Sequence, residues 1–159
     1  MTRAYVGLGA NLGDPRAQVE TALAALDALP STRVAVRSSL YRSAPVGVGP
    51  QPEFVNAVAA LDTTLSAEAL LDALLALEAR HGRERPHPGA ARTLDLDLLL
   101  HGREERATPA LVLPHPRLHQ RRFVLEPLAE IAPGLEVPGH GPVEVLLARC
   151  RDQAVERIA

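Results

Sequence analysis

The most constraining feature of this sequence is the order in which its hydrophobic periodicity changes. Strand patterns occupy residues 3–9, 33–42, 54–61 and 93–100. Helical spacing follows Asp14-Pro15 and then Ser66, and both sites carry residues typical of helix starts. The order strand, helix, strand, strand, helix, strand is the split βαβ pattern. We therefore expect an α+β fold in which helices cover an antiparallel sheet, with the segments 33–42 and 54–61 as neighbours.

The remaining segments complete one expected domain. Residues 82–91 are polar and rich in glycine and proline, which indicates an exposed loop. A short helix is expected at 122–131 and a last helix at about 143–158. The chain has 159 residues without an internal repeat or a linker, so we expect a single domain over 1–159.

Composition narrows the classes of function. All 17 basic residues are arginine, which excludes mechanisms that need a P-loop or Schiff-base lysine. A net charge of -2 gives no basic field for nucleic acid, so a phosphate group would have to meet a local arginine cluster. The segment MTRAYVGLGAN lacks the long apolar core typical of a signal peptide, and no apolar run approaches the ~18 residues of a membrane span. Cys150 is the single cysteine. We expect a cytoplasmic monomer that binds neither nucleic acid nor membrane.

Asp95 and Asp97 are the strongest candidate ligands for a metal ion. In the segment TLDLDL the strand period of two puts the leucines on one face and both carboxylates on the other. Two such carboxylates suit Mg²⁺, which fills its remaining positions with water and phosphate oxygens. Simple alternation also produces a polar outer face without any function, so the pair of aspartates alone does not establish a metal site.

Arginines beside the acid pair favour a polyphosphate ligand. Arg80, Arg83, Arg85 and Arg92 all lie within fifteen residues before Asp95. Guanidinium groups match phosphate oxygens and neutralise charge that develops during transfer. The alternative is a solvated basic loop.

Histidines give a weaker signal. His115 stands between two prolines, and its imidazole could donate to phosphate or bind a metal. His119 follows four residues later, but Pro116 disfavours the helix that a zinc-binding pair would need. The other histidines are expected at the surface: His81, His87, His101 and His140.

Two further segments bear on ligand binding. Phe54 and Asn56 share a strand face, so a flat ligand could stack on the ring while the amide binds its polar edge, although Phe54 and Phe123 could equally be core residues. The segment GLGANLG at 7–13 resembles a dinucleotide-binding fingerprint, but its glycine spacing differs and no acidic residue ends the second strand. We interpret it as a tight structural turn.

These motifs together resemble the 6-hydroxymethyl-7,8-dihydropterin pyrophosphokinase family of the folate pathway. The resemblance runs nearly end to end and rests on RTLDLD at 92–97, Pro114-His115, Arg121-x-Phe123 and Phe54-x-Asn56. It implies a ferredoxin-like fold and transfer of diphosphate from ATP to the pterin alcohol, with two Mg²⁺ ions at the acid pair.

The resemblance also implies roles for individual residues. The pterin-side residues are Ser43, Ala44, Val46, Phe54, Asn56 and Phe123. The residues facing the nucleotide or its phosphates are Glu78, Arg83, Arg85, Arg92, His115 and Arg121, with Arg83 and Arg92 stabilising the charge that develops during transfer. Glu78 fits this role on its own account, because it falls on the apolar helix stripe of Leu71 and Leu75, where an unpaired carboxylate is costly.

Some positions depart from the family pattern. Residues 88–91 are PGAA where the family has Trp-Gly-Pro, Phe54 replaces a tyrosine, and Ala10 replaces a serine. A metal-dependent phosphohydrolase and a ferredoxin-like module that binds a ligand without chemistry remain the alternatives.

Overall fold

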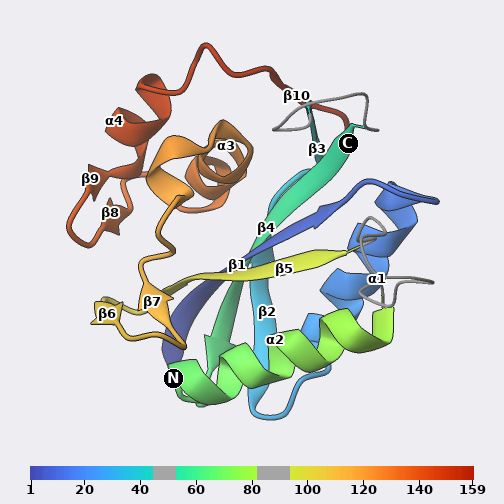
Figure 1. Ribbon diagram of the computed structural model, residues 1–159, viewed down its shortest axis with the longest axis vertical. Coiled ribbons are helices and arrows are strands. Elements are labelled where there is room, and N and C mark those ends of the chain that lie inside the picture. Colours follow the sequence, from blue (N-terminus) through green and yellow to red (C-terminus); the bar gives the residue numbers. More distant parts are fainter. Residues whose placement is uncertain (45–52, 82–93) are drawn as a thin grey trace.

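The main sheet has the ferredoxin-like arrangement that the sequence predicts (Figure 1). The computed structural model describes residues 1–44, 53–81 and 94–159. Its strands run in the order β10-β3-β4-β1-β5, and every pair is antiparallel. β2 also pairs with β4, along a different part of that strand from β3. The sheet strands are β1 (Thr2–Ala10), β2 (Thr32–Arg37), β3 (Tyr41–Ser43), β4 (Phe54–Thr63), β5 (Asp95–His101) and β10 (Val155–Arg157). Two small hairpins consist of β6 (Arg106–Ala107) with β7 (Val112–Leu113) and β8 (Glu136–Val137) with β9 (Gly141–Pro142).

The helices begin where their capping residues predict. Asp14 accepts a hydrogen bond from the Ala17 backbone N–H, and Ser66 accepts one from that of Ala69. The helical elements are α1 (Pro15–Asp27), α2 (Ala67–His81), the 3₁₀ helix η1 (Leu118–Gln120), α3 (Arg122–Ile131) and α4 (Val143–Ala148). Within the described ranges, no helix combines the length and the apolar character that crossing a bilayer requires.

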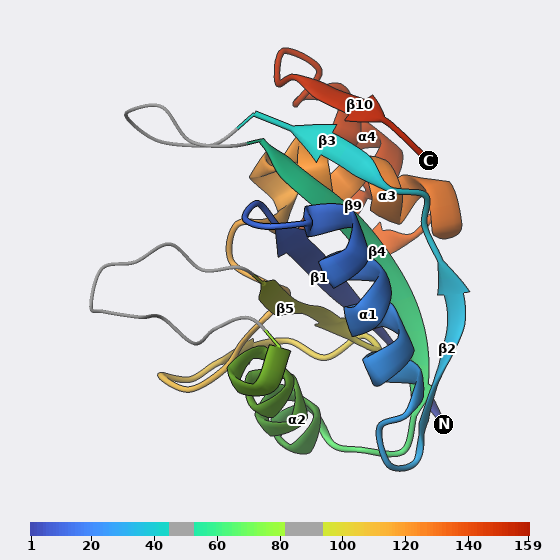
Figure 2. The same cartoon turned by 90° about the vertical axis from the view of Figure 1, so that its right-hand side faces the viewer.

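Helices cover both faces of the sheet, and strand alternation decides which residue faces which layer (Figure 2). On β1, Val6 and Leu8 pack into the core beneath α1 and α2, whereas Tyr5 packs into the core beneath α3 and α4. On β4, Ala57 belongs to the first core and Val58 to the second. α3 does not cover the C-terminal end of β1 or the N-terminal ends of β4 and β5. There the face of the sheet that packs against α3 elsewhere lines a cavity.

Two expected elements differ from the structure. The strand expected at 33–42 is divided into β2 and β3, and the Ser38 side chain at the break accepts a hydrogen bond from the Val58 backbone N–H. The helix expected at 143–158 is wrong beyond Ala148. There the chain turns, and β10 pairs with the edge of β3 instead. Pairing with the edge of β3 satisfies the backbone hydrogen-bonding groups of this segment. The spacing of its apolar residues cannot reveal such a pairing, because the partner strand is remote in the sequence.

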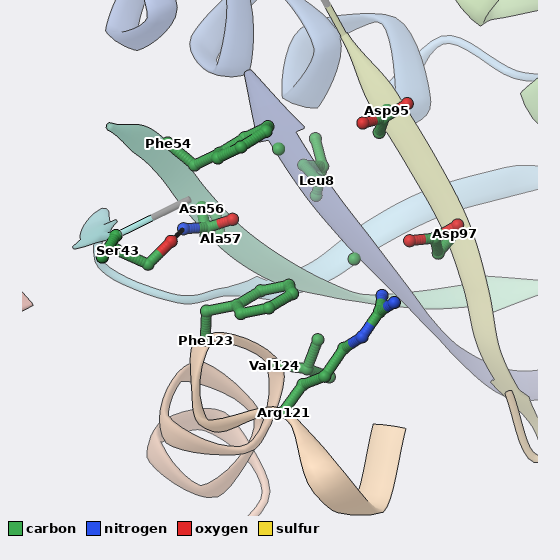
Figure 3. Close-up of a pocket in the computed structure, with 13 residues that line it drawn as sticks. Leu8, Ser43, Phe54, Asn56, Ala57, Asp95, Asp97, Arg121, Phe123 and Val124 are labelled. Carbon is green, nitrogen blue, oxygen red and sulfur yellow. Dashed lines mark hydrogen bonds between the residues drawn. The ribbon is translucent and has the colours of Figure 1, made fainter. Parts of the chain in front are cut away.

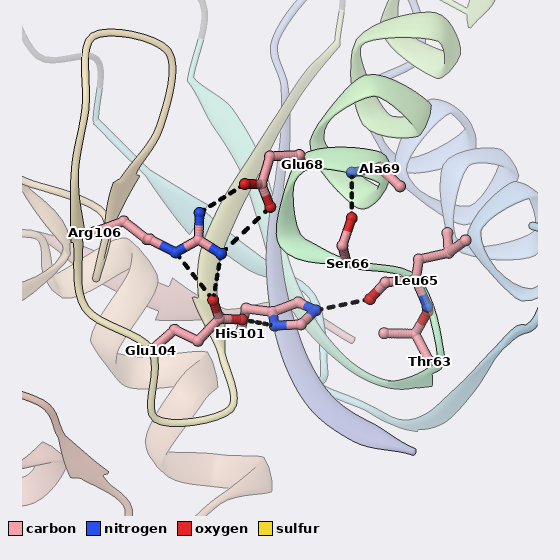
Figure 4. A network of polar contacts seen from close by, with 8 residues as sticks. All are labelled: Thr63, Leu65, Ser66, Glu68, Ala69, His101, Glu104 and Arg106. Carbon is pink, nitrogen blue, oxygen red and sulfur yellow. Dashed lines mark hydrogen bonds and ion pairs between the residues drawn. The ribbon is translucent and has the colours of Figure 1, made fainter.

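The expectation that His101 is a surface residue is also wrong, because it is only 5% exposed. Its ring contacts the Leu65 carbonyl through Nε2 and the Glu104 carboxylate through Nδ1 (Figure 4). Arg106 then joins Glu104 to Glu68 in the first turn of α2. This network attaches the end of β5 to the beginning of α2.

Glu130 attaches α3 to the sheet. Its side chain is 24% exposed and accepts hydrogen bonds from the Tyr41 hydroxyl at 2.7 Å and from the Ser39 backbone N–H at 3.0 Å. Burial alone raises the pKa of Glu130, but the bonds from Tyr41 and Ser39 outweigh it and hold that pKa below its ordinary value. The charged carboxylate is therefore the form that stabilises this contact.

We predict that Glu130→Gln lowers the free energy of unfolding by about 1 to 3 kcal/mol near neutral pH, because the buried Tyr41 hydroxyl and the partly exposed Ser39 N–H lose a charged acceptor. The folded-state pKa is lowered, so the contribution of Glu130 is complete above its unfolded-state pKa and is lost as pH falls through the folded-state value. The difference between wild type and variant should therefore shrink on acidification. Urea denaturation over a pH series measures both effects.

The same substitution at Glu156 is the matched control. That side chain is 66% exposed and pairs with Arg42 at the surface. Such exposed ion pairs contribute little to stability, so Glu156→Gln should leave the free energy of unfolding nearly unchanged. Equal effects of the two substitutions would contradict the role assigned to Glu130.

Candidate active site

A cavity of about 190 Å³ opens where β1, β4 and β5 extend beyond α3 (Figure 3). Its wall includes eight of the site residues named from the sequence, and those that belong to the sheet share the face that α3 partly covers. The residues lining it are Gly7, Leu8, Gly9, Ser43, Ala44, Phe54, Asn56, Ala57, Asp95, Asp97, Arg121, Phe123 and Val124.

The floor of the cavity is formed by glycine. Gly9 is the strand neighbour of Asn56 on one side and of Asp95 on the other, while Gly7 is the neighbour of Asp97. A Cβ atom at Gly9 would lie 3.3 Å from the Asn56 Oδ1, which is tighter than ordinary packing. Both glycines belong to β1, so the interpretation of 7–13 as one tight turn is wrong for its first half. Sequence reasoning missed their role, because their place beside Asn56 and the acid pair depends on the register between strands.

Two aromatic rings, one amide and one hydroxyl form the walls nearest to β3. Phe54 and Phe123 lie on opposite sides of the cavity, and Asn56 and Ser43 lie between them at one end (Figure 3). The Asn56 Nδ2 donates to the Ser43 Oγ at 2.6 Å, and both residues are buried. The structure thus brings together the predicted stacking and edge-binding residues, and Ala44 lies beside them.

Both aspartates project from the predicted face of β5. Leu94, Leu96 and Leu98 pack into the opposite core, while Asp95 and Asp97 are half-buried and line the cavity. Two carboxylates on one side of a strand, open to a space large enough for phosphate and water, fit the ligand preference of Mg²⁺. In the part of the chain that is described, no group of three or more histidine, cysteine or acidic residues forms a metal cluster.

His115 presents a defined nitrogen to the acid pair. Its Nδ1 accepts a hydrogen bond from the Arg117 backbone N–H at 3.2 Å, and its Nε2 lies 3.9 Å from the Asp97 Oδ1. Burial lowers the pKa of His115, and Arg121 adds to this effect while Asp97 opposes it. Because Nδ1 is an acceptor, the neutral ring carries its hydrogen on Nε2 and can donate it toward the site.

Arg121 connects the first cavity to a second one of about 360 Å³, which Asp95, Asp97, His115 and Arg117 also line. Its guanidinium carbon lies 5.5 Å from the centre of the Phe123 ring. A planar cation therefore stands at the boundary between the aromatic cavity and the acid pair. Arg117 was not predicted, and only its position beside His115 could have indicated it.

Glu78 has a precise structural partner. This carboxylate on α2 is only 4% exposed, and its Oε2 accepts a hydrogen bond from the Leu96 backbone N–H at 2.8 Å. It lines a cavity of about 330 Å³ on the outer side of β5, together with Leu71, Leu75 and His115. Glu78 thus ties the strand that carries both aspartates to α2.

Four of the predicted site residues lie outside the described residues: Val46, Arg83, Arg85 and Arg92. The weak zinc hypothesis gains no support, because His119 stacks on His140, with ring centres 4.1 Å apart, whereas His115 faces Asp97. The two histidines of the proposed pair therefore have different partners.

Solved structures share this fold. A structure of Plasmodium falciparum HPPK-DHPS with pteroate matches 93% of this chain with a TM-score of 0.73 and 12% sequence identity. Another, of HPPK-DHPS in complex with substrates, matches 94% with a TM-score of 0.71 and 12% identity. The chain spans less than half of each of those proteins, 42% and 45%. At these identities the likeness shows the fold.

Sequence comparison identifies the family. The family model for 7,8-dihydro-6-hydroxymethylpterin-pyrophosphokinase matches residues 5–133. Proteins named 2-amino-4-hydroxy-6-hydroxymethyldihydropteridine pyrophosphokinase from Pseudomonas aeruginosa and Haemophilus influenzae are 48% and 40% identical to this chain. The matches cover 98% and 99% of this chain and 96% and 99% of those relatives. The chain therefore belongs to the 7,8-dihydro-6-hydroxymethylpterin-pyrophosphokinase family.

Proposed function

We propose that this chain transfers a diphosphate group from ATP to the hydroxymethyl group of 6-hydroxymethyl-7,8-dihydropterin, releasing AMP, as a step of folate biosynthesis. The observation that carries the proposal is one cavity with aromatic rings, an amide and a hydroxyl at one end and two carboxylates at the other. A flat ligand held by the first end has its substituent directed to the second. Family membership supports the same reaction.

The aromatic end is the proposed pterin site. Phe54 and Phe123 would stack on the two faces of the ring, and stacked aromatic pairs are stabilising beyond the area that they bury. Asn56 and Ser43 would bond to its polar edge, with Ala44 and Val46 completing the pocket. The hydrogen bond between Asn56 and Ser43 fixes the amide orientation before the substrate arrives.

The acidic end is the proposed phosphate site. Asp95 and Asp97 would hold two Mg²⁺ ions, which when bound neutralise triphosphate charge and polarise phosphorus–oxygen bonds. The hydroxymethyl oxygen attacks the β-phosphorus in line as the bond from that phosphorus to the AMP oxygen breaks. Arg121 and the His115 Nε2–H would donate to phosphate oxygens, which is supported by the cavity that both residues line together with Asp95 and Asp97.

The nucleotide is proposed to lie along the outer side of β5. Glu78 and His115 line the cavity there, and its leucine side chains suit an apolar base. Arg83, Arg85 and Arg92 are proposed to bind the phosphates, with Arg83 and Arg92 stabilising the charge that grows on the bridging oxygen. We also propose a cytoplasmic monomer that has no nucleic-acid partner, in keeping with the acidic balance of the chain.

The reaction itself is tested with purified protein, ATP, Mg²⁺ and 6-hydroxymethyl-7,8-dihydropterin, following AMP and the pterin diphosphate. Formation of both, dependent on the pterin and abolished by chelation of Mg²⁺, is the expected result. Release of inorganic phosphate without a pterin requirement would indicate a phosphohydrolase. Ligand binding without consumption of ATP would indicate a binding module.

Asp95→Asn and Asp97→Asn should each lower kcat by about a hundredfold or more, since each replaces a charged metal ligand by a neutral amide. The unfolding midpoint should stay close to that of wild type. Asp72→Asn on the exposed side of α2 is the matched control and should retain full activity. Near-normal turnover in either active-site variant would refute the metal assignment.

Gly9→Ala should raise the KM for the pterin by about tenfold, because the added methyl group approaches the buried Asn56 amide. Gly7→Ala is the milder comparison on the same strand, because it also adds a methyl group to the cavity floor but its Cβ would meet Leu99 at an ordinary 3.5 Å, so a smaller rise in KM is expected. Steady-state kinetics with the pterin varied at saturating ATP distinguishes the two. An unchanged KM in Gly9→Ala would show that this part of the floor does not limit the pocket.

A further inference from the structure

Gln153 holds the backbone on both sides of an active-site arginine. It lies between α4 and β10, beyond the residues 5–133 that match the family model. Its Nε2 donates to the Gln120 carbonyl at 2.8 Å, and its Oε1 accepts from the Arg122 backbone N–H at 2.9 Å. One carboxamide therefore bridges the junction of η1 and α3, where Arg121 is the connecting residue.

The junction needs such a partner. The first backbone N–H groups of a helix have no acceptor within the helix and are ordinarily satisfied by a side chain at the cap. Arg121 occupies the cap position of α3 with extended dihedral angles, φ −120° and ψ 108°, and makes no capping hydrogen bond with its side chain. Gln153 supplies the acceptor from 31 residues further along the chain.

Arg122 in turn holds the segment that carries Gln153. The Arg122 guanidinium donates from Nη1 to the carbonyls of Gln153 at 2.8 Å and Arg151 at 3.2 Å. The same guanidinium is held by Glu126 one turn along α3. The C-terminal segment and the start of α3 thus restrain each other through side chains from both.

We propose that Gln153 is a positioning residue that fixes Arg121 and Phe123 in the substrate cavity. Arg121 lies between the two bonds of the carboxamide, and Phe123 follows in the first turn of the helix that those bonds anchor. Both side chains line the cavity, and Gln153 does not; it lines an adjoining cavity of about 550 Å³ that Arg121 and Phe123 also border. The expected effect on kcat/KM rests on the proposed function. The expected effect on the placement of Arg121 and Phe123 does not.

Two substitutions remove the bridge in different ways. Gln153→Met keeps the length of the side chain and loses both hydrogen bonds, while Gln153→Glu keeps an acceptor for Arg122 and loses the donor to Gln120. Both should lower kcat/KM for the pterin about tenfold per folded molecule, since small displacements of reacting or stacking groups are costly. Gln120→Ala is the control, because Gln120 enters the bridge through its backbone carbonyl only.

A double-mutant cycle separates positioning from general stability. In an Arg121→Ala background, Gln153→Met should lower kcat/KM by less than it does in wild type, because the part of its effect that acts through Arg121 is already lost. An undiminished effect there, or wild-type kinetics in both Gln153 variants, would overturn the inference while leaving the proposed reaction intact.

A structural readout decides the matter even if wild type forms no pterin diphosphate. Crystal structures of wild type and Gln153→Met should differ in the placement of the Arg121 and Phe123 side chains. Identical placement would overturn the positioning role. A Gln153→Met protein that fails to fold is replaced in this comparison by Gln153→Glu, which retains the bond to the first N–H of α3.

Discussion

The active site depends on the lack of side chains on one face of the central strand. Gly7 and Gly9 lie on β1 between β4 and β5, so no side chain of β1 separates Asn56 on one side from Asp95 on the other. Groups from both neighbouring strands can therefore reach one ligand. Any larger residue at position 9 would project toward this cavity, and its first added atom would lie 3.3 Å from the Asn56 side-chain oxygen, which is tighter than ordinary packing.

The same strands serve packing and chemistry through their alternation. Leu8 and Leu96 fill the core beneath α1 and α2, while their neighbours along each strand face the cavity: Gly7 and Gly9 on β1, and Asp95 and Asp97 on β5. The face that meets α3 changes along its length from apolar, at Val58 and Leu100, to polar at the open end of the strands. The core thus fixes the orientation of the ligand-facing side chains, because a shift of one residue in register would exchange the two faces.

Alternation is also why much of the site could be predicted from the sequence. The common face of Asp95 and Asp97, and that of Phe54 and Asn56, follow from a period of two within a single strand. The juxtaposition of Gly9 with Asn56 does not, because it depends on the register between strands. The pairing of β10 with β3 and the bridge made by Gln153 join residues far apart in the chain, and helical spacing after Val143 indicated a helix instead.

The described part of the site is divided into an anionic half on the sheet and a cationic half beside it. Asp95 and Asp97 are fixed by β5, whose position Glu78 secures through the Leu96 backbone. Arg121 instead belongs to the irregular junction between η1 and α3. Transfer between two bound substrates requires both halves at the correct separation, since misplaced charges stabilise a transition state poorly. The separation is therefore set by contacts remote from the chemistry, which attach the helical layer to the sheet and to the C-terminal segment.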